Sequence, residues 1–257
     1  MSRDTTTPPG APVWDDAALA DPHGRSDKAA RVERMFDAIA PTYERVNALA
    51  SLGQDARWRR RAVARADVRA SDIVLDLCCG TGDMIRAFAR GSPAPRAILG
   101  IDFSQQMLAA GSYDGIRTPI SLCRADALRL PLRDATVDVV SCAFGVRNFQ
   151  DLDAGLREIR RVLKPSGRVV LLEFATPENP VLRWGYRLYT QAVLPRLGAW
   201  ISRDASGAYR YLPQSIQTFA RRGEMLDRLR TVGFAQVAAD TMNFGSVVIY
   251  RGVVAGG

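Results

Sequence analysis

The sequence predicts an α/β protein with a mostly parallel β-sheet covered by helices on both faces, and two observations lead to this prediction. The length of 257 residues and the hydrophobic share of 47% suit one globular domain with a sizeable core. From residue 73 onward, short apolar segments alternate with segments of helical periodicity, as in a sheet built from strand–helix–strand units. Right-handed crossovers between parallel strands then leave few topologies.

The N-terminal quarter is expected to contain a tail and a helical cap. Residues 1–25 are rich in Pro, Thr, Asp and Gly without periodicity, so we expect a disordered tail. This tail includes His23, the single histidine, for which no catalytic role is expected. A helical pattern covers residues 26–66. We therefore expect a single domain over residues 26–257, with residues 26–66 as its cap.

The region after the cap is expected to supply the sheet. Strands are expected at residues 73–78, 97–102, 120–124, 137–142 and 168–173, with helices at 83–90, 104–112 and 152–163. Residues 177–222 then break the alternation with a long aromatic and arginine-rich insertion. A helix at 224–232 and strands at 234–239 and 246–251 complete the domain. Because the link between these two strands is short, we expect them to pair antiparallel.

Composition limits the partners and the location of the chain. The net charge of +8 comes mainly from arginine, since Lys28 and Lys164 are the two lysines among 35 basic residues. A basic surface attracts anionic membranes or nucleic acid, and the lack of a recognition motif disfavours nucleic acid. No apolar run reaches about 18 residues and no secretory signal is evident, which favours a cytoplasmic location. The four cysteines form no metal-ligand pattern, so we expect reduced thiols and no metal.

A glycine-rich turn, CGTGD at residues 79–83, follows the first expected strand and precedes a helix. Gly80 and Gly82 permit positive φ and let a ligand approach the backbone beyond the carboxyl end of the sheet. The turn is neither G-x-G-x-x-G nor a P-loop, and an ordinary strand-to-helix turn with capping acids has a similar sequence. The turn alone therefore indicates a ligand site without identifying the ligand.

Acidic residues at the ends of the next two strands narrow the choice of ligand. Asp102 ends the second strand about 20 residues after the glycine turn, where a carboxylate accepts hydrogen bonds from ribose hydroxyls. Asp126 follows the third strand, where a carboxylate can accept from the exocyclic amine of adenine, and Ala127 leaves room for the ring. This combination favours S-adenosylmethionine, with a nicotinamide dinucleotide as the minor alternative.

The same motifs resemble those of class I methyltransferases. DLCCGTGD, GIDFSQQML and ADALRLPLRDATVDVV are similar to the first motifs of that class. The resemblance implies a Rossmann-like sheet of seven strands with a reversed last strand, and S-adenosylmethionine as methyl donor without a metal. The cofactor-binding set expected on this basis is Asp76, Gly80, Thr81, Gly82, Asp102, Phe103, Asp126, Ala127 and Ala143.

Further motifs resemble the UbiE/MenG family of quinone-biosynthesis C-methyltransferases. They are FDAIAPTYERVNALASLGQDARWRR, AFGVRNFQD, REIRRVLKPSGRVVLLEF, YRYLPQSIQTF and VVIYRG, and they occur in order over residues 32–252. The resemblance implies methylation of a ring carbon of demethylmenaquinol or of 2-polyprenyl-6-methoxy-1,4-benzoquinol, a ubiquinone precursor. Asp126 and Ala143 stand where ubiquinone-type members often carry Asn and Ser, which favours demethylmenaquinol. Cys79 stands where many members have a small residue, without affecting the cofactor prediction.

Methylation of a quinol carbon requires a base, or a cation that favours the phenolate. Arg147 in AFGVRN follows the fourth expected strand and is expected to stabilise the phenolate, while Asn148 orients the quinol. The structural alternative for Arg147 is a salt bridge to a nearby acid such as Asp151. Tyr209 and Tyr211 are secondary candidates for a hydrogen bond to a quinol oxygen, or else half-buried core residues.

The insertion at residues 177–222 is expected to form a lid over the prenyl tail of the quinol. Apolar residues recur there at helical spacing beside arginines: Leu182, Tyr186, Tyr189, Val193, Leu197 and Trp200, with Arg183, Arg187, Arg196 and Arg203. Such a stripe suits a membrane interface or a lipid groove, or else a helix that faces the core. Tyr43, Asn47 and Trp58 of the cap are expected to form the opposite wall.

Two other functions remain open at this point. One is methylation of another lipid or small phenol, and the other is a non-catalytic scaffold that binds S-adenosylmethionine within a quinone-biosynthesis complex. A fold and a cofactor site do not define the acceptor, so the sequence separates these functions poorly. A peripheral position at the inner face of the membrane and a homodimer are further expectations.

Overall fold

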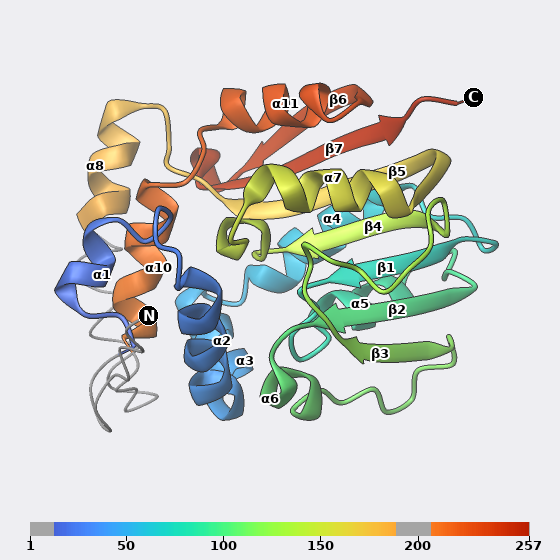
Figure 1. Cartoon of the computed structure of the whole chain (residues 1–257), viewed down its shortest axis with the longest axis horizontal. Helices are drawn as coiled ribbons and strands as arrows, with labels where there is room; N and C mark the ends of the chain where they lie inside the picture. The colour runs from blue at the N-terminus through green and yellow to red at the C-terminus, as the bar shows by residue number, and fades with distance from the viewer. Residues whose placement is uncertain (1–12, 189–206, 257) are drawn as a thin grey trace, which may run out of the picture.

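The structure, a computed structural model, describes residues 13–188 and 207–256. Within them, seven strands form one sheet in the order β3–β2–β1–β4–β5–β7–β6 (Figure 1). The strands are β1 (Ile73–Leu77), β2 (Ala97–Asp102), β3 (Ile120–Arg124), β4 (Val137–Ala143), β5 (Leu163–Phe174), β6 (Phe234–Met242) and β7 (Val247–Val254). β1 to β5 pair in parallel, and β7 runs antiparallel to both β5 and β6. The predicted fold class, with its reversed last strand, is confirmed.

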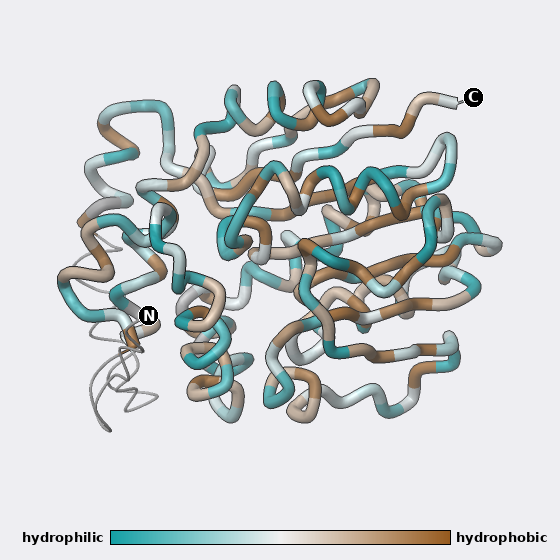
Figure 2. Tube along the Cα trace, in the orientation of Figure 1, coloured by the Kyte–Doolittle hydropathy of each residue, from teal (hydrophilic) through white to brown (hydrophobic). Residues whose placement is uncertain are grey.

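Helices cover both faces of this sheet (Figure 1). One face carries α4 (Asp55–Ala66), α5 (Asp83–Ala89) and α6 (Gln105–Ala109), and the other carries α7 (Leu152–Val162) and α11 (Arg222–Thr231). Each layer encloses its own hydrophobic core against the sheet. Strands buried on both faces need apolar residues at successive positions, which explains the hydrophobic sheet interior in Figure 2.

Short side-chain caps fix the loops that follow the strands. The Asp151 carboxylate accepts the Ala154 N–H at 2.9 Å at the start of α7. The Ser104 hydroxyl accepts the Met107 N–H at 3.1 Å at the start of α6. Each cap satisfies an N–H that the helix itself leaves unpaired. The loops between strand ends and helices are therefore held in one conformation, and these loops carry the predicted site residues.

The N-terminal cap lies beyond the carboxyl ends of the parallel strands (Figure 1). It consists of α2 (Lys28–Ile39), the 3-10 turn η1 (Ala40–Thr42) and α3 (Tyr43–Ala50). α8 (Pro180–Leu188) and α10 (Ala208–Gln217) belong to the insertion, and α10 packs against α2. The insertion residues at 189–206, including Tyr189, Val193, Arg196, Leu197, Trp200 and Arg203, lie outside the described residues. These helices enclose the edge of the sheet where ligands bind in α/β folds.

The prediction of a disordered tail is wrong for residues 13–25. This segment contains α1 (Asp16–Ala20), whose N-terminal Asp15 accepts the Ala18 N–H at 2.7 Å. Trp14 is fully buried and stacks on Tyr211 of α10 with ring centroids 4.2 Å apart. Two buried apolar side chains, Trp14 and Ala18, are enough to dock a segment whose average composition is polar.

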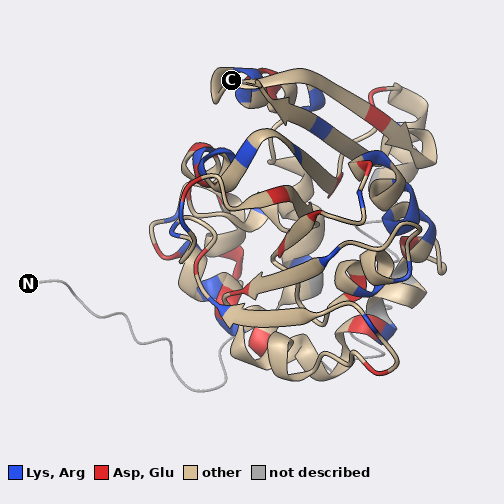
Figure 3. Cartoon of the chain, turned by 90° about the vertical axis from the view of Figure 1, so that its right-hand side faces the viewer, with Lys and Arg blue, Asp and Glu red and all other residues tan. Residues whose placement is uncertain are grey.

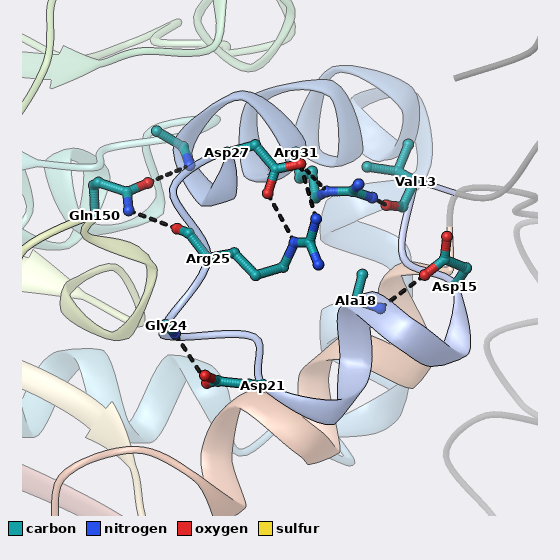
Figure 4. A network of polar contacts seen from close by, with 10 residues as sticks. Val13, Asp15, Ala18, Asp21, Gly24, Arg25, Asp27, Arg31 and Gln150 are labelled. Atoms are coloured by element: carbon teal, nitrogen blue, oxygen red, sulfur yellow. Dashed lines mark hydrogen bonds and ion pairs between the residues drawn. The ribbon is translucent and has the colours of Figure 1, made fainter. Parts of the chain in front are cut away.

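Polar contacts complete this docking (Figure 4). Asp27 accepts hydrogen bonds from Arg25 and Arg31, both at 2.8 Å, and Arg31 also donates to the Val13 carbonyl at 2.5 Å. The Gln150 side chain donates to the Arg25 carbonyl at 2.7 Å. The N-terminal segment is therefore tied both to α2 and to the loop before α7.

The first prediction concerns this segment. We expect Trp14→Ala to lower the free energy of unfolding by about 3–5 kcal/mol, because it removes a large buried ring and leaves a cavity. Urea unfolding of the full chain measures the change. The control is Trp184→Ala in α8, whose side chain is 70% exposed and whose replacement should change stability by less than about 0.5 kcal/mol. Equal stabilities of the two variants would contradict the assignment of Trp14 to the core.

Two surface properties bear on partners. None of the helices in residues 13–188 and 207–256 is long and apolar enough to cross a membrane. At the end of the molecule opposite the cap, acidic and basic residues are interspersed (Figure 3). Such mixing produces no extended field of one sign at that end.

Candidate functional site

The predicted cofactor residues meet at one edge of the sheet. Thr81 follows β1, Asp102 ends β2, Asp126 follows β3 and Ala143 ends β4. Because these strands are parallel and adjacent, their carboxyl ends bring the four positions together. The site is therefore assembled by the sheet register and by the short loops that leave it.

Glycine is required in the turn after β1. Gly82 has φ +88°, and a Cβ atom at this position would lie 2.4 Å from Cε1 of Tyr113. Gly80 has φ +54°, and a Cβ there would lie 3.1 Å from the Met107 side chain. Side chains at either position would strain the backbone and collide with Tyr113 or Met107. Glycine therefore allows the turn to adopt its conformation beneath these two side chains.

Asp102 organises the turn and the next loop together. One oxygen of its carboxylate accepts the Gly80 N–H at 2.8 Å, and the other accepts the Ser104 N–H at 2.9 Å. The residue is only 6% exposed, and burial raises the pKa of its carboxyl to about 6. Each oxygen retains lone-pair capacity for a ligand hydroxyl.

A cavity of about 510 Å³ opens at this point. Asp102, Phe103, Asp126 and Ala127 all line it, so the structure brings four of the predicted cofactor residues together. Asp126 is exposed, and its carboxylate also accepts the Leu128 N–H at 2.9 Å. Residues that were not expected from the sequence form another part of the wall, from the cap and from the loop before α7: Ala29, Ala30, Glu33, Phe149 and Gln150. Asn148, which was expected at the quinol, also lines this cavity.

Buried polar atoms without partners lie beside the turn. Asp76 of β1 is 1% exposed, and neither of its carboxylate oxygens has a hydrogen-bond partner. The hydroxyls of Thr81 and of Ser141 are likewise buried without partners. Unsatisfied buried polar atoms are costly and rare, and here they accumulate where a ligand with a cation and hydroxyl groups would satisfy them. The residues present therefore fit the donor that the motifs imply.

The buried carboxyl group of Asp76 is expected to make the stability of the protein depend on pH. Burial raises the pKa of its carboxyl from 3.8 to about 7, against the opposing effect of the Arg59 charge. The folded state then binds a proton that the unfolded chain has released, so this group makes stability fall as pH rises from about 4 to about 7. We expect Asp76→Asn to raise the free energy of unfolding at pH 8 by up to about 4 kcal/mol, and at pH 5 by less than half of that gain.

Urea unfolding at pH 5 and pH 8 measures this effect. The control is Asp114→Asn, because Asp114 is an exposed aspartate on the loop after α6. A gain for the Asp76 variant that is equal at both pH values would show that removal of the buried charge is not its cause.

An aromatic cavity of about 240 Å³ lies between the sheet edge, the cap and α10. Phe144 and Phe174 stack with ring centroids 4.3 Å apart, and Trp58 meets both rings edge-on. Tyr43 and Asn47 also line this cavity, so the three cap residues predicted to form a wall do so. We call this space the aromatic cavity; its apolar lining suits a flat, hydrophobic ring with an apolar tail.

Arg147 and Glu173 form a buried ion pair at the wall of the aromatic cavity. Nη1 of Arg147 lies 2.7 Å from Oε1 of Glu173 and also donates to the Phe144 carbonyl at 2.6 Å. Glu173 is fully buried, which raises the pKa of its carboxyl, while the Arg147 charge opposes the rise. Nε of Arg147 is buried without a hydrogen-bond partner. The alternative of a structural salt bridge is borne out in kind, with Glu173 as the acid. Asp151, the acid named for it, caps α7 instead.

Of the other predicted catalytic residues, Asn148 and Tyr211 contact each other, while the Tyr209 side chain is not described. The Tyr211 hydroxyl donates to the Asn148 side-chain oxygen at 2.9 Å, and Tyr211 is fully buried against Trp14. Asn148 is thereby oriented beside Arg147, and Tyr211 is a core residue that lines the aromatic cavity. Tyr209 lies on α10, and its side chain is outside the described residues.

Glu173, the buried partner of Arg147, was not among the residues expected from the sequence. It stands near the carboxyl end of β5, in the apolar run VVLLEF. An acidic residue within a strand buried on both faces is itself a signal, because an unpaired charge there would be strongly destabilising. Such a residue needs a cationic partner from a neighbouring strand end, and the loop after β4 supplies Arg147.

Comparisons with known proteins agree with this geometry. The model of the ubiE/COQ5 methyltransferase family matches residues 25–254. A demethylmenaquinone methyltransferase of Deinococcus radiodurans is 44% identical over 212 residues, which are 82% of this chain and 87% of the relative. A ubiquinone/menaquinone biosynthesis C-methyltransferase UbiE of Geobacter sulfurreducens is 41% identical over 235 residues, with coverages of 88% and 90%.

Solved structures share the fold at low sequence identity. The [4+2]-cyclase SpnF has a TM-score of 0.66 at 17% identity, covering 89% of this chain and 97% of its own. A SAM-dependent methyltransferase of Thermotoga maritima has a TM-score of 0.58 at 16% identity, with coverages of 86% and 98%. At such low identity, these structures support the fold alone. The family model and the two relatives, which are more than 40% identical, also establish the family. The chain belongs to the ubiE/COQ5 methyltransferase family.

Proposed function

We propose that this chain transfers the methyl group of S-adenosylmethionine to a ring carbon of demethylmenaquinol, giving menaquinol. The observation that carries the proposal is the aromatic cavity with the buried Arg147–Glu173 pair at its wall, beside a turn with unpartnered polar atoms. The relatives named demethylmenaquinone methyltransferase support the choice of acceptor. The Asp at position 126 and the Ala at 143 favour the same branch.

The residues around the turn would hold the methyl donor. In this assignment Asp102 accepts the ribose hydroxyls, Asp126 the adenine amine, and Phe103 and Ala127 enclose the ring. Asp76, Thr81 and Ala143 would surround the methionine end, where the buried carboxylate of Asp76 can pair with the ammonium group. When bound, S-adenosylmethionine supplies an electrophilic methyl group. The residues described form no group of His, Cys, Asp and Glu that could hold a metal ion.

The residues of the aromatic cavity would activate the quinol. Methyl transfer forms a C–C bond, breaks a C–S bond and releases one proton in total. The reaction is favoured when a ring hydroxyl is ionised, and the Arg147 guanidinium can stabilise the oxyanion through its positive charge. Arg147 cannot act as a simple base, because the pKa of arginine exceeds about 12. Glu173 holds the guanidinium in place. Asn148, which was expected to orient the quinol, lines the cofactor cavity rather than the aromatic cavity, and its amide contacts Tyr211 and Phe144.

The location of the enzyme follows from its substrate. A prenylated quinol partitions into the bilayer, so we propose that the chain works in the cytoplasm as a peripheral protein at the inner face of the membrane. Leu52, at the mouth of the aromatic cavity, is 81% exposed, which supports such a contact. Nucleic acid is not among the proposed partners, and a homodimer stays a prediction.

Purified protein tests the proposal directly. Labelled S-adenosylmethionine is incubated with short-chain demethylmenaquinol, or with the methoxybenzoquinol analogue as a second acceptor. We expect label on the naphthoquinol ring and a clearly slower reaction with the benzoquinol. Preference for the benzoquinol would shift the assignment to ubiquinone biosynthesis, and donor binding without transfer to either acceptor would indicate a scaffold.

A further inference from the structure

An arginine-rich pocket adjoins the aromatic cavity on the outside of the molecule. It has a volume of about 700 Å³ and lies among the first turns of α8 and α11, the end of α10 and the 3-10 turn η4 (Asn243–Gly245). Phe174, Ile216 and Asn243 line both spaces, so the two share a wall. We call this space the arginine pocket. The proposed quinol site makes no use of it.

Positive charge predominates in the arginine pocket. Arg183, Arg221 and Arg222 line it, and Glu178 is the one acidic residue among the described lining residues. Glu178 pairs with Arg222 at 2.6 Å, so two positive charges remain in excess. Arg183 donates to the backbone carbonyls of Pro177 and Glu178 at 3.0 and 2.9 Å, which fixes its guanidinium. Arginines held in this way bind the oxygens of a phosphate group through paired N–H donors.

An exposed aromatic residue stands at the edge of the same pocket. Phe244 in η4 is 83% exposed and has φ +57°, a left-handed conformation that is strained for a bulky side chain. Its neighbour Asn243 accepts the Trp58 ring N–H at 3.0 Å and donates to Gln54 at 2.7 Å, which holds the turn against the cap. Phe244 gains no burial within the chain for this strain. Its position indicates a contact with something outside the chain.

A strongly exposed apolar side chain lies at each of the two spaces. Leu52 borders the aromatic cavity and Phe244 borders the arginine pocket, and both side chains are more than four-fifths exposed. Apolar tips beside arginines match an anionic bilayer, in which the tips enter the acyl region while the guanidinium groups remain at the phosphates. A soluble anion would account for the arginines but not for Phe244.

We propose that the arginine pocket binds the phosphate of an anionic phospholipid headgroup. This contact sets the mouth of the aromatic cavity on the membrane surface, from which a prenylated quinol enters. The identity of the entering molecule rests on the proposed function, whereas the lipid contact rests on the pocket and on Phe244. Each can therefore be tested without the other.

Vesicle co-sedimentation of the full chain tests the lipid contact. The vesicles contain either phosphatidylcholine alone or a mixture with phosphatidylglycerol, and we expect binding to the mixture only. The double variant Arg221→Gln/Arg222→Gln should bind about 25-fold more weakly, because each arginine near the surface contributes about 1 kcal/mol. The matched control is Arg230→Gln/Arg228→Gln, at the other end of α11, which should bind like the unmodified chain.

Phe244→Gly separates insertion from folding. Glycine relieves the left-handed strain, so this variant should be at least as stable as the unmodified chain while binding the mixed vesicles more weakly. Equal binding to both vesicle types, or unchanged binding of the Arg221/Arg222 variant, would overturn the proposal. Saturable binding of inorganic phosphate that displaces no vesicles, and is lost in the Arg221/Arg222 variant, would identify a site for a free anion instead.

The two proposals fail in distinguishable ways. Methylation of a short-chain quinol in detergent needs no bilayer, so the Arg221/Arg222 and Phe244 variants should retain normal turnover there. Loss of vesicle binding with normal turnover in detergent supports the lipid contact. Vesicle binding by a chain that methylates no quinol would contradict the proposed function and leave the lipid contact intact.

Discussion

Asp102→Ala is expected to weaken S-adenosylmethionine binding by about 100-fold or more, or about 3 kcal/mol. The carboxylate has two tasks in the proposed site. It accepts the N–H groups of Gly80 and Ser104, which fixes the turn after β1 against the loop after β2. It also offers its remaining lone pairs to the ribose hydroxyls. Alanine removes the ligand contacts and releases both loops, so the loss exceeds that of one hydrogen bond.

Titration calorimetry with S-adenosylmethionine measures the change in affinity. Asp126→Ala serves as a comparison with a smaller expected effect. Because Asp126 is exposed, its contact with the ligand competes with water, and we expect the affinity to fall by about tenfold or less. Asp114→Ala, on the exposed loop after α6, should leave the affinity unchanged. Near-normal binding by the Asp102 variant, with unfolding behaviour like that of the unmodified chain, would refute the cofactor assignment.

The relative placement of the proposed cofactor residues could be predicted from the sequence because its signals are local. Each residue stands directly after a short apolar strand, and parallel pairing places the ends of adjacent strands side by side. Asp102 and Asp126 could therefore be placed together before any contact was known. The limits of β2 and β3 agree with the predicted ranges, because apolar patterning and turn residues mark both ends of these strands.

The parts that the sequence did not reveal depend on contacts between distant segments. Trp14 is buried because Tyr211, far along the chain on α10, offers a ring to stack against. Composition averaged over residues 1–25 cannot detect such a contact. β5 begins at Leu163 rather than at 168, because Leu163 pairs with Val137 across an irregularity in the register. Tertiary pairing, which local propensity does not encode, decides such boundaries.

The partner of Arg147 illustrates the same limit within the catalytic half. Asp151 is close in sequence and at a helix start, which made it the expected partner. Glu173 lies one strand away, and the parallel pairing of β4 with β5 brings it next to the loop that follows β4. Asp151 meanwhile satisfies an N–H of α7 that would otherwise be unpaired. Helix capping thus determined the role of Asp151, and burial determined that of Glu173.

Arg147→Ala is expected to lower turnover by about 1000-fold while the affinity for S-adenosylmethionine changes little. Two described cations line the aromatic cavity, Arg59 and Arg147, and Arg59 is paired with Asp83 at 3.2 Å. Arg147 is the one we assign to the ionised quinol hydroxyl, and it does not line the cofactor cavity. Without it the quinol ionises less readily. The residual rate of the variant should therefore continue to rise at alkaline pH, where the unmodified enzyme has already reached its plateau.

Stability complicates this experiment, because Arg147 and Glu173 are both buried. Removal of one partner leaves the other charge buried and unpaired, at a cost of about 3–5 kcal/mol. The double variant Arg147→Met/Glu173→Met removes both charges and keeps the volume filled, so its stability should approach that of the unmodified chain. Its turnover should remain as low as that of Arg147→Ala. A role in folding alone would instead restore turnover together with stability.

A remote pair of the same kind provides the control. Arg168 is paired with Asp72, which is buried, at the amino end of the sheet and away from both cavities. Arg168→Ala should lower the free energy of unfolding but leave turnover within about twofold of normal at a temperature where the variant is folded. Steady-state assays of these variants, with urea unfolding in parallel, separate the two effects. If Arg147→Ala loses no more turnover than Arg168→Ala, the ion pair serves the fold and the quinol is activated by another group.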